Sequence, residues 1–318
     1  MTQWWETPPY QVMDGGSKAS AIPVYNYFVE QAKGLNPKYV SMIIPARWYS
    51  GGRGLDSFRE SMIHDKRIEK LFDYIDSNDC FAGVDIAGGI CYFLWNAQYN
   101  GDCQVTNAHN GDRHVSTRKL DSGDVFVRYS QALSIIEKVQ NGEHINYDSR
   151  VSSQKPFGLR TYVVPTESGD IALRYNKGMG PFSRDKVTVG LDWIDKWKVI
   201  MSYLTHDHAG RSDKDGKRRI FSVTEILPPK TVCTETYIVI DGFNTENEAK
   251  NLLAYLKTKL VRFLVAQVTT TQHISKANFS LVPVQDFIKP WSDTELYEKY
   301  GLTEEEIGFI EATIKPME

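Results

Sequence analysis

The first hundred residues of the chain alternate between segments with helical spacing and short segments that are almost entirely apolar. Helical spacing is found at residues 22–32 and again after residue 54, a near-continuous apolar run occupies residues 39–44, and residues 68–75 and 86–95 are two further strand candidates. Short apolar runs between helices are typical of strands buried in a parallel sheet. The alternation therefore predicts an α/β fold in which helices cover a parallel-rich sheet.

The pattern changes after the turn signal Tyr-Asn-Gly-Asp at residues 99–102. Beyond this turn the apolar runs are shorter, and glycines, prolines and charged residues separate them. We expect an α+β domain here, with a helix over residues 131–139 and short strands near residues 125–128, 159–164, 171–175, 199–204, 220–226 and 236–240.

The C-terminal part of the chain contains three helix signals. Residues 245–265 carry one amphipathic stripe, with Thr245 as the N-cap and Glu248 at the capping-box position. Ser292 and Thr303 are the expected N-caps of two further short helices. The chain is therefore predicted to consist of an α/β domain over residues 1–100, an α+β domain over residues 101–287 and a helical tail over residues 288–318.

The composition is that of an ordinary globular protein, with 41% hydrophobic and 24% charged residues. The cysteines at positions 80, 91, 103 and 233 lack C-x-x-C spacing, which predicts free thiols in a reducing cytoplasm. No apolar run approaches the roughly 20 residues that span a bilayer, and the first residues do not resemble a signal peptide. These features predict a soluble, cytoplasmic protein without a structural metal site.

Basic residues are concentrated in the middle of the chain. Residues 150–219 hold 14 Lys and Arg against eight Asp and Glu, although the whole chain has a net charge of −3. This asymmetry favours a polyanionic partner, and the alternative is a charged surface that contacts only solvent. The densest cluster lies in one polar loop and supplies five candidates for contacts to nucleic-acid phosphates: Arg211, Lys214, Lys217, Arg218 and Arg219.

Close to the N-terminus the chain contains the tetrapeptide Thr7-Pro8-Pro9-Tyr10. It resembles the catalytic tetrapeptide of DNA methyltransferases that act on an exocyclic amine, usually Asn, Asp or Ser followed by Pro-Pro-Tyr or Pro-Pro-Phe. In that chemistry a side-chain oxygen and the Pro8 carbonyl accept the two hydrogens of the amine, while Tyr10 stacks on the flipped base. By itself, a four-residue pattern of this kind also occurs in ordinary loops.

Further segments carry the same resemblance, in the same order, along nearly the whole chain. They are a Gly-Gly-Ser loop at residues 15–17, a strand ending Ile-Ile-Pro-Ala-Arg-Trp at residues 43–48, a strand Gly-Gly-Ile-Cys-Tyr-Phe-Leu-Trp at residues 88–95, and C-terminal stretches at residues 258–264, 272–276, 282–283 and 285–287. Together they resemble the downstream catalytic half and the target-recognition domain of adenine-specific DNA methyltransferases of the restriction-modification methylase family.

The resemblance implies that residues 1–100 form a partial Rossmann-like methyltransferase sheet and that the following α+β domain recognises double-stranded DNA. It also implies methyl transfer from S-adenosylmethionine to the exocyclic amine of a flipped adenine, with the tetrapeptide as the catalytic residues. Arg47, Arg53 and Arg67 are candidates for phosphate contacts or for closing on the flipped base, and solvated charges are the alternative.

Two features depart from the family pattern. Thr7 replaces the usual Asn, Asp or Ser with a bulkier hydroxyl side chain. The glycine-rich turn that binds the methyl donor normally precedes the tetrapeptide, and we find no such turn in this sequence. We therefore expect the cofactor site to belong to a separate N-terminal subunit, or the chain to be a truncated, non-catalytic DNA-recognition module.

Other catalytic chemistries are not supported by residue spacing. His206, Asp207 and His208 alternate between the two sides of a strand end and lack a third metal ligand. Residues 210–217 differ by one position from a phosphate-binding loop, and Arg218 replaces the Ser or Thr that holds magnesium. We therefore expect neither a metal site nor an ATPase.

Overall fold

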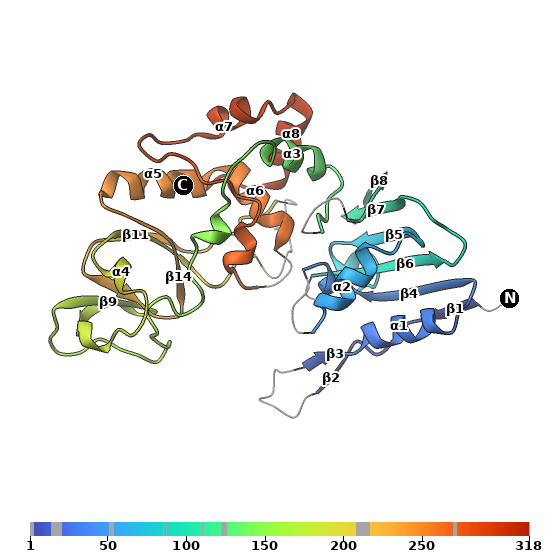
Figure 1. Cartoon of the computed structure of the whole chain (residues 1–318), viewed down its shortest axis with the longest axis horizontal. Coiled ribbons are helices and arrows are strands. Elements are labelled where there is room, and N and C mark those ends of the chain that lie inside the picture. Colours follow the sequence, from blue (N-terminus) through green and yellow to red (C-terminus); the bar gives the residue numbers. More distant parts are fainter. Residues whose placement is uncertain are drawn as a thin grey trace. The chain divides into compact units, whose positions relative to one another are not determined.

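A computed structural model of the chain describes residues 3–13, 21–50, 54–84, 86, 88–109, 111–121, 126–207, 217–269 and 272–317 (Figure 1). The chain divides into two compact units. Unit 1 contains Met1–Ala132, and unit 2 contains Leu133–His208 and Ser212–Glu318. Unit 1 extends beyond the turn at residues 99–102 because two strands that follow this turn belong to its sheet.

Unit 1 is built around a six-stranded sheet with the strand order β1-β4-β6-β5-β7-β8. The β1–β4 and β5–β7 pairs are parallel, and the other three pairs are antiparallel. The strands are β1 (Gln3–Glu6), β4 (Tyr39–Pro45), β5 (Ile68–Tyr74), β6 (Ile90–Asn96), β7 (Cys103–His109) and β8 (Asp112–Arg118).

The predicted α/β class is confirmed, but the expected parallel-rich sheet is wrong. β6 runs antiparallel between β4 and β5. A parallel connection needs a crossover, usually a helix, and α2 (Asp56–Ile63) provides one between β4 and β5. In the described part of the segment between β5 and β6, the only helix is the short 3-10 helix η2 (Ser77–Asp79), and the chain returns antiparallel beside β5.

One face of this sheet is covered and the other is only half-buried. Helices α1 (Tyr25–Gly34) and α2 contribute to the same hydrophobic core as Val40 and Met42 of β4. On β4, β5 and β6 the burial alternates along the strand, as expected when one face contacts the core. A two-stranded hairpin of β2 (Gln11–Met13) and β3 (Ala21–Pro23) precedes α1.

Unit 2 contains two three-stranded sheets, with strand orders β10-β9-β13 and β12-β11-β14. Both contribute to one hydrophobic core, in which Leu173, Ile200 and Val239 are fully buried. The strands are β9 (Ile171–Tyr175), β10 (Gly178–Phe182), β11 (Trp197–Ser202), β12 (Thr224–Leu227), β13 (Thr231–Cys233) and β14 (Tyr237–Phe243). The strand predicted over residues 159–164 is wrong, because this segment is irregular.

The helices of unit 2 are α3 (Ala132–Val139), α4 (Leu191–Ile194), α5 (Glu246–Lys257), α6 (Lys259–Val268), α7 (Asp293–Tyr300) and α8 (Glu304–Thr313). The single helix predicted over residues 245–265 is wrong, because Thr258 ends α5 and caps α6 through its hydroxyl. The predicted caps at Thr245, Ser292 and Thr303 are confirmed. Among the described residues, no helix is long and apolar enough to cross a membrane.

Candidate active site

Several strands of unit 1 meet at one edge of its sheet, which we call the carboxyl edge. β1 and β4 run parallel, with Glu6 opposite Met42, so their carboxyl ends point the same way. β5 ends and β6 begins at the same edge, because Ile90 pairs with both Pro45 and Tyr74. In open α/β sheets, ligands bind outside the carboxyl ends of the strands. A binding site is therefore expected at this edge.

The Thr-Pro-Pro-Tyr tetrapeptide follows β1 at the carboxyl edge. Because proline has no backbone N–H, two prolines cannot continue the hydrogen-bonded ladder, and the chain leaves the sheet here. Pro8 is buried, Thr7 and Pro9 are exposed, and Tyr10 is half-buried. The Tyr10 carbonyl accepts a hydrogen bond from the Val24 amide at 3.2 Å. This bond joins the end of the tetrapeptide to the N-cap of α1.

Tyr10 is partly removed from solvent. Burial raises the pKa of Tyr10, and the cysteines Cys91 and Cys80 act in the same direction. Burial also raises the pKa of Cys91 to about 12, so this thiol carries no charge near pH 7. The Trp48 indole donates a hydrogen bond to the Cys91 Sγ at 3.4 Å. A neutral ring beside buried aromatic and thiol groups suits stacking better than proton transfer.

Arg47 is the predicted arginine that the structure places at the carboxyl edge. It lies on the 3-10 helix η1 (Ala46–Ser50), directly after β4, and its side chain is half-buried. Burial and Cys91 raise the pKa of Tyr25, and the Arg47 guanidinium acts in the opposite direction. Arg47 and the tetrapeptide directly follow β4 and β1, two parallel neighbouring strands that end at the carboxyl edge.

A buried ion pair fixes the segment that enters β6. The Arg128 guanidinium is bidentate on Asp73, with the Nε–Oδ2 and Nη2–Oδ1 distances both 2.7 Å. The same guanidinium donates to the Gly88 carbonyl at 2.8 Å and to the Tyr74 carbonyl at 3.1 Å. Burial lowers the pKa of Arg128, but the Asp73 carboxylate raises it by more, so the cation stays charged. One side chain thus joins the end of β5 to the beginning of β6.

Gly89 allows the Tyr74 carbonyl and the Arg128 guanidinium to approach the backbone of this junction closely. Its φ of +76° lies in the left-handed region, and a Cβ there would be 2.2 Å from the Tyr74 carbonyl oxygen and 2.8 Å from Arg128 Nη2. Glycine alone has neither the conformational restriction nor the clash. The Gly89 carbonyl also accepts a hydrogen bond from the Ala46 amide at 3.0 Å. Gly89 therefore links β6 to the helix that carries Arg47.

The loop between β5 and β6 supplies further side chains to the carboxyl edge. The buried Ser77 hydroxyl donates to the Val84 carbonyl at 2.6 Å and accepts from the Ile86 amide at 2.9 Å. The Phe81 amide donates to the Ser77 carbonyl at 2.8 Å. These bonds position Cys80, which acts on Tyr10, and the half-buried ring of Phe81 beside it.

Arg67 lies at the opposite edge of the sheet from the tetrapeptide. It precedes β5, and its carbonyl accepts a hydrogen bond at 2.9 Å from Asn96, the last residue of β6. Its Nε donates to the Asp65 carboxylate at 2.7 Å, and its guanidinium lies 4.8 Å from the centre of the Trp95 ring. This position corrects the expectation that Arg67 closes on a base beside Tyr10. A phosphate contact by Arg67 stays a prediction.

Arg218 is an interior residue of unit 2. Only 4% of it is exposed, its Nη1 donates to the Ala266 carbonyl at 3.2 Å, and its Nε lies 3.6 Å from Asp207 Oδ2. The structure does not present this guanidinium on the surface, so burial argues against the expected contact of Arg218 with DNA, which stays an untested prediction. Among the described residues, His206 and Asp207 are not part of any His, Cys, Asp and Glu group that could hold a metal.

The other cations of the predicted basic loop are placed only in part. Arg211 and Lys214 lie outside the described residues, as does Arg53 of unit 1. The Lys217 ammonium donates to the Glu311 carbonyl at 2.9 Å. Arg219 is half-buried. DNA contacts by Lys217 and Arg219 therefore stay predictions.

The Asp73–Arg128 pair was missed by sequence reasoning, although one signal for it was present. Asp73 occupies the same face of β5 as the buried Leu71, where an apolar residue is expected. A charged residue on a buried strand face needs a partner of opposite charge. The sequence does not show which cation supplies it, because Arg128 is 55 residues away.

Comparison with known proteins confirms the resemblance drawn from the sequence. Residues 7–81 match the model of the Eco57I restriction-modification methylase family, a segment that begins with the tetrapeptide and ends at Phe81. The chain is 40% identical over 149 residues to an uncharacterized adenine-specific methylase of Mycoplasma pneumoniae, a match that covers 45% of this chain and 33% of the relative. The chain therefore spans about a third of the length of the curated relative it matches.

Two solved structures of restriction enzymes are also similar. The type IIG restriction endonuclease BpuSI matches 90% of this chain and 45% of its own, with a TM-score of 0.35 and 11% identity. The type IIL restriction-modification enzyme MmeI, solved in complex with DNA, matches 84% of this chain and 42% of its own, with a TM-score of 0.46 and 9% identity.

Proposed function

We propose that the chain is the base-binding and DNA-recognition portion of an adenine-specific DNA methyltransferase of a restriction-modification system, acting in the cytoplasm. Unit 1 holds the flipped adenine, and unit 2 recognises duplex DNA. The observation that carries the proposal is the tetrapeptide directly after a parallel strand, at the carboxyl edge of the sheet. The matches to the methylase family and to an adenine-specific methylase support it.

In this proposal the tetrapeptide orients and polarises the adenine amine. The Thr7 hydroxyl and the Pro8 carbonyl accept the two hydrogens of the amine, which increases the electron density on its nitrogen. Thr7 is exposed and Tyr10 is half-buried, so both are within reach of a base that has left the duplex. Because its pKa is raised, the Tyr10 ring is neutral when it stacks on the base.

Phe81 offers a second aromatic surface for the same base. It lies in the loop between β5 and β6, at the carboxyl edge where the tetrapeptide follows β1, and its ring is half-buried. A flipped base is usually held between aromatic or apolar side chains. We therefore assign to Phe81 the face of the adenine opposite to Tyr10.

S-adenosylmethionine supplies the methyl group in reactions of this class. The glycine pair at the carboxyl edge does not fit this cofactor, because the Tyr74 carbonyl and the Arg128 guanidinium fill the space beside Gly89. We therefore do not place the cofactor at this glycine pair, and we propose that its site belongs to a further segment or to a separate N-terminal subunit. This chain contributes the positions of the adenine and of the DNA.

The test is the transfer of a labelled methyl group to unmethylated duplex DNA, with the chain assayed alone and together with the polypeptide encoded directly upstream. Tyr10→Ala should lower methylation about 10- to 100-fold, because stacking of a base on an aromatic ring contributes roughly 1–3 kcal/mol. Tyr10→Phe keeps the ring and should stay close to the unmodified protein. Phe81→Ala should reduce activity in the same direction.

Tyr27→Ala is the matched control, because Tyr27 is an exposed tyrosine on α1 of the same unit. It should leave methylation unchanged. An equal loss in Tyr10→Ala and Tyr10→Phe would overturn the stacking role of the ring. Absence of methyl transfer by the unmodified chain in every combination would overturn the proposed activity.

A second candidate function is a DNA-recognition module without catalysis. It is favoured by Thr7, which replaces the amide, carboxylate or smaller hydroxyl of the family pattern, and by the filled space beside Gly89. Thr7→Asn separates the two functions. If Thr7 limits catalysis, asparagine raises methylation in the reconstituted system. If the chain is a recognition module, methylation stays absent while salt-dependent binding to duplex DNA persists.

A further inference from the structure

Unit 2 has a hollow of about 560 Å³ on its surface. It lies between an irregular segment that precedes β9 and the turn that leads into α4. The hollow is lined by Ser152, Ser153, Lys155, Pro156, Val189, Gly190, Asp192 and Trp193. Ordered loops that are as long as this irregular segment and lack secondary structure are uncommon and are usually functional.

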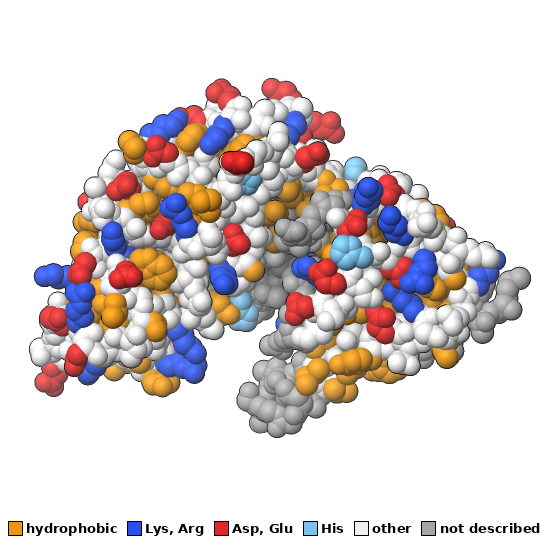
Figure 2. Space-filling model, viewed as in Figure 1, with side chains coloured by type: hydrophobic (Ala, Val, Ile, Leu, Met, Phe, Trp, Pro, Cys, Tyr) orange, Lys and Arg blue, Asp and Glu red, His pale blue; other side chains and the backbone are white. Residues whose placement is uncertain are grey.

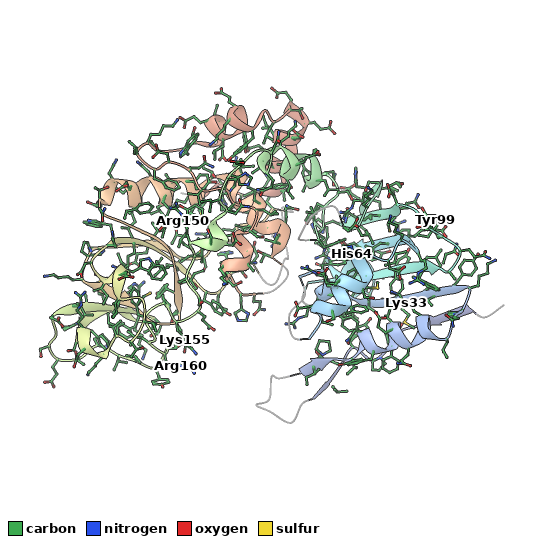
Figure 3. The ribbon with its side chains drawn as sticks, viewed as in Figure 1. Lys33, His64, Tyr99, Arg150, Lys155 and Arg160 are labelled. Atoms are coloured by element: carbon green, nitrogen blue, oxygen red, sulfur yellow. The ribbon has the colours of Figure 1, made fainter. Side chains whose placement is uncertain are left out.

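Lys155 lines this hollow and shares one carboxylate with Arg160. The Lys155 ammonium and the Arg160 guanidinium lie 3.9 and 3.6 Å from Glu235 Oε2. The Glu235 side chain is 12% exposed, whereas those of Lys155 and Arg160 are 34% and 54% exposed. The two cations exceed the Glu235 carboxylate by one charge and are more exposed than it is, and the Asp192 carboxylate also lines the hollow. Figure 2 shows basic and hydrophobic side chains together at this end of unit 2, where Figure 3 places Lys155 and Arg160 side by side.

The backbone that carries Lys155 is conformationally restricted and closely packed. Lys155 has a φ of 66°, which is unusual for a residue other than glycine and marks a strained position. Gly190, on the other side of the hollow, has a φ of +67°, and a Cβ there would lie 2.3 Å from the Pro156 carbonyl oxygen. The fully buried Phe157 anchors the segment in the core of unit 2. The surface is therefore preorganised, which lowers the entropic cost of binding.

Aromatic side chains accompany the cations. Trp193 lines the hollow, and its ring packs against Phe157 with the ring centres 6.5 Å apart. Tyr162, two residues beyond Arg160, is 81% exposed. Cations combined with accessible aromatic rings are typical of surfaces that bind nucleic acids, since cations contact phosphates and rings contact sugars and bases.

We propose that Lys155 and Arg160 bind the phosphates of duplex DNA, with the sugar–phosphate backbone lying over the hollow beside Trp193. The inference rests on the proposed function and specifies the part of unit 2 that contacts the DNA. It differs from the expectation based on sequence, which placed the contacts in the loop at residues 211–219. In that loop, Arg218 is buried and the Lys217 ammonium is held by a backbone carbonyl.

The experiment measures the affinity of the full chain for duplex DNA as a function of salt concentration. Each phosphate contact contributes about −0.9 to the slope of log K against log salt concentration. The double variant Lys155→Ala, Arg160→Ala should therefore bind more weakly and have a slope smaller in magnitude by about 2, regardless of the DNA sequence. Circular dichroism of each variant checks that it is folded.

The matched control is the double variant Lys250→Ala, Lys289→Ala. It removes the same charge from unit 2, at side chains that are 59% and 55% exposed and paired with Glu246 and Glu295. Its slope should equal that of the unmodified chain. An unchanged slope in the Lys155, Arg160 variant, or an equal decrease in both variants, would overturn the assignment of this surface. If the unmodified chain binds no duplex DNA, the proposed function itself fails.

Discussion

Each unit of the protein buries a long basic side chain. The two units compensate the buried positive charge with different groups. Arg128 in unit 1 is bidentate on the Asp73 carboxylate, which keeps its pKa above the usual value. Lys198 in unit 2 is fully buried and donates to the carbonyls of Ile194, Lys196 and Pro228. Burial lowers the pKa of Lys198 to about 8.

The difference shows what a buried charge contributes in each unit. A carboxylate partner keeps Arg128 charged at any pH near neutrality, so its four hydrogen bonds to Asp73, Gly88 and Tyr74 hold the carboxyl edge together. Carbonyl dipoles compensate a cation less completely, because they carry only partial charges. Lys198 therefore joins the end of α4 to the segment before β13 at a cost that depends on pH.

The largest expected effect comes from Arg128→Met, which removes the cation and leaves the Asp73 carboxylate buried. Breaking a buried ion pair in this way costs about 3–5 kcal/mol, and urea unfolding of the full chain measures it. The double variant Asp73→Leu, Arg128→Met removes both charges and should regain much of this free energy. If the double variant is as unstable as the single one, an unpaired charge is not the cause.

Lys198→Met tests the buried lysine of unit 2 through the pH dependence of the free energy of unfolding. Because the folded pKa of about 8 lies below the unfolded value of 10.5, the charged form is penalised only in the folded state. Below pH 8 the full cost of burying the charged lysine lowers the free energy of unfolding. This cost disappears as the pH rises from 8 to 10.5. The free energy of unfolding of the native protein should therefore rise by about 2–3 kcal/mol relative to Lys198→Met across this interval. Parallel pH profiles would contradict the prediction.

Gly89→Ala sharpens the comparison at the point where Arg128 contacts the backbone. The added Cβ meets the Tyr74 carbonyl and the guanidinium, so we expect a loss of about 1–3 kcal/mol in stability. Gly83→Ala is the control, because Gly83 has a similar φ of +79° with no atom within 4 Å of the position that an added Cβ would occupy. Equal losses in the two variants would show that backbone strain alone is responsible.

The smallest effect is expected from Arg67→Ala at the opposite edge of the sheet. Arg67 is exposed, and the Asp65 carboxylate that it binds keeps two other partners, Lys33 at 3.2 Å and the Trp95 indole at 2.9 Å. The loss should stay below about 1 kcal/mol, as for other surface ion pairs. A loss as large as that of Arg128→Met would mean that burial does not distinguish the two arginines.

Local patterns in the sequence predicted many of the elements but not their arrangement. The N-caps at Thr245, Ser292 and Thr303 were predicted correctly, because a cap depends on residues within one helical turn. The antiparallel insertion of β6 was not predicted, since apolar runs do not reveal which strands become neighbours. The irregular segment at residues 159–164 was mistaken for a strand, because an apolar run does not show whether a ladder partner is present, and here Tyr162 and Val164 are exposed.

The candidate sites also differ in how far local sequence could predict them. The tetrapeptide could be recognised from four adjacent residues, because its chemistry is local. The five cations of the basic loop could be identified from the sequence, but the sequence does not show which of them are buried. Only the structure shows that Arg218 is an interior residue. The pair of Lys155 and Arg160 gave no signal in the sequence, since the carboxylate that they share, Glu235, lies 75 residues beyond Arg160.

The sequence alone determined the α/β class of the first unit, the resemblance to restriction-modification methylases and the Thr-Pro-Pro-Tyr tetrapeptide on which the proposed base binding depends. All three depend on residues that are close together in the chain. The tertiary structure decided which arginine accompanies the tetrapeptide, which one is buried against Asp73, and which cations of unit 2 face solvent. These outcomes depend on burial and on pairs of charges that are far apart in the chain, and only folding brings such residues together.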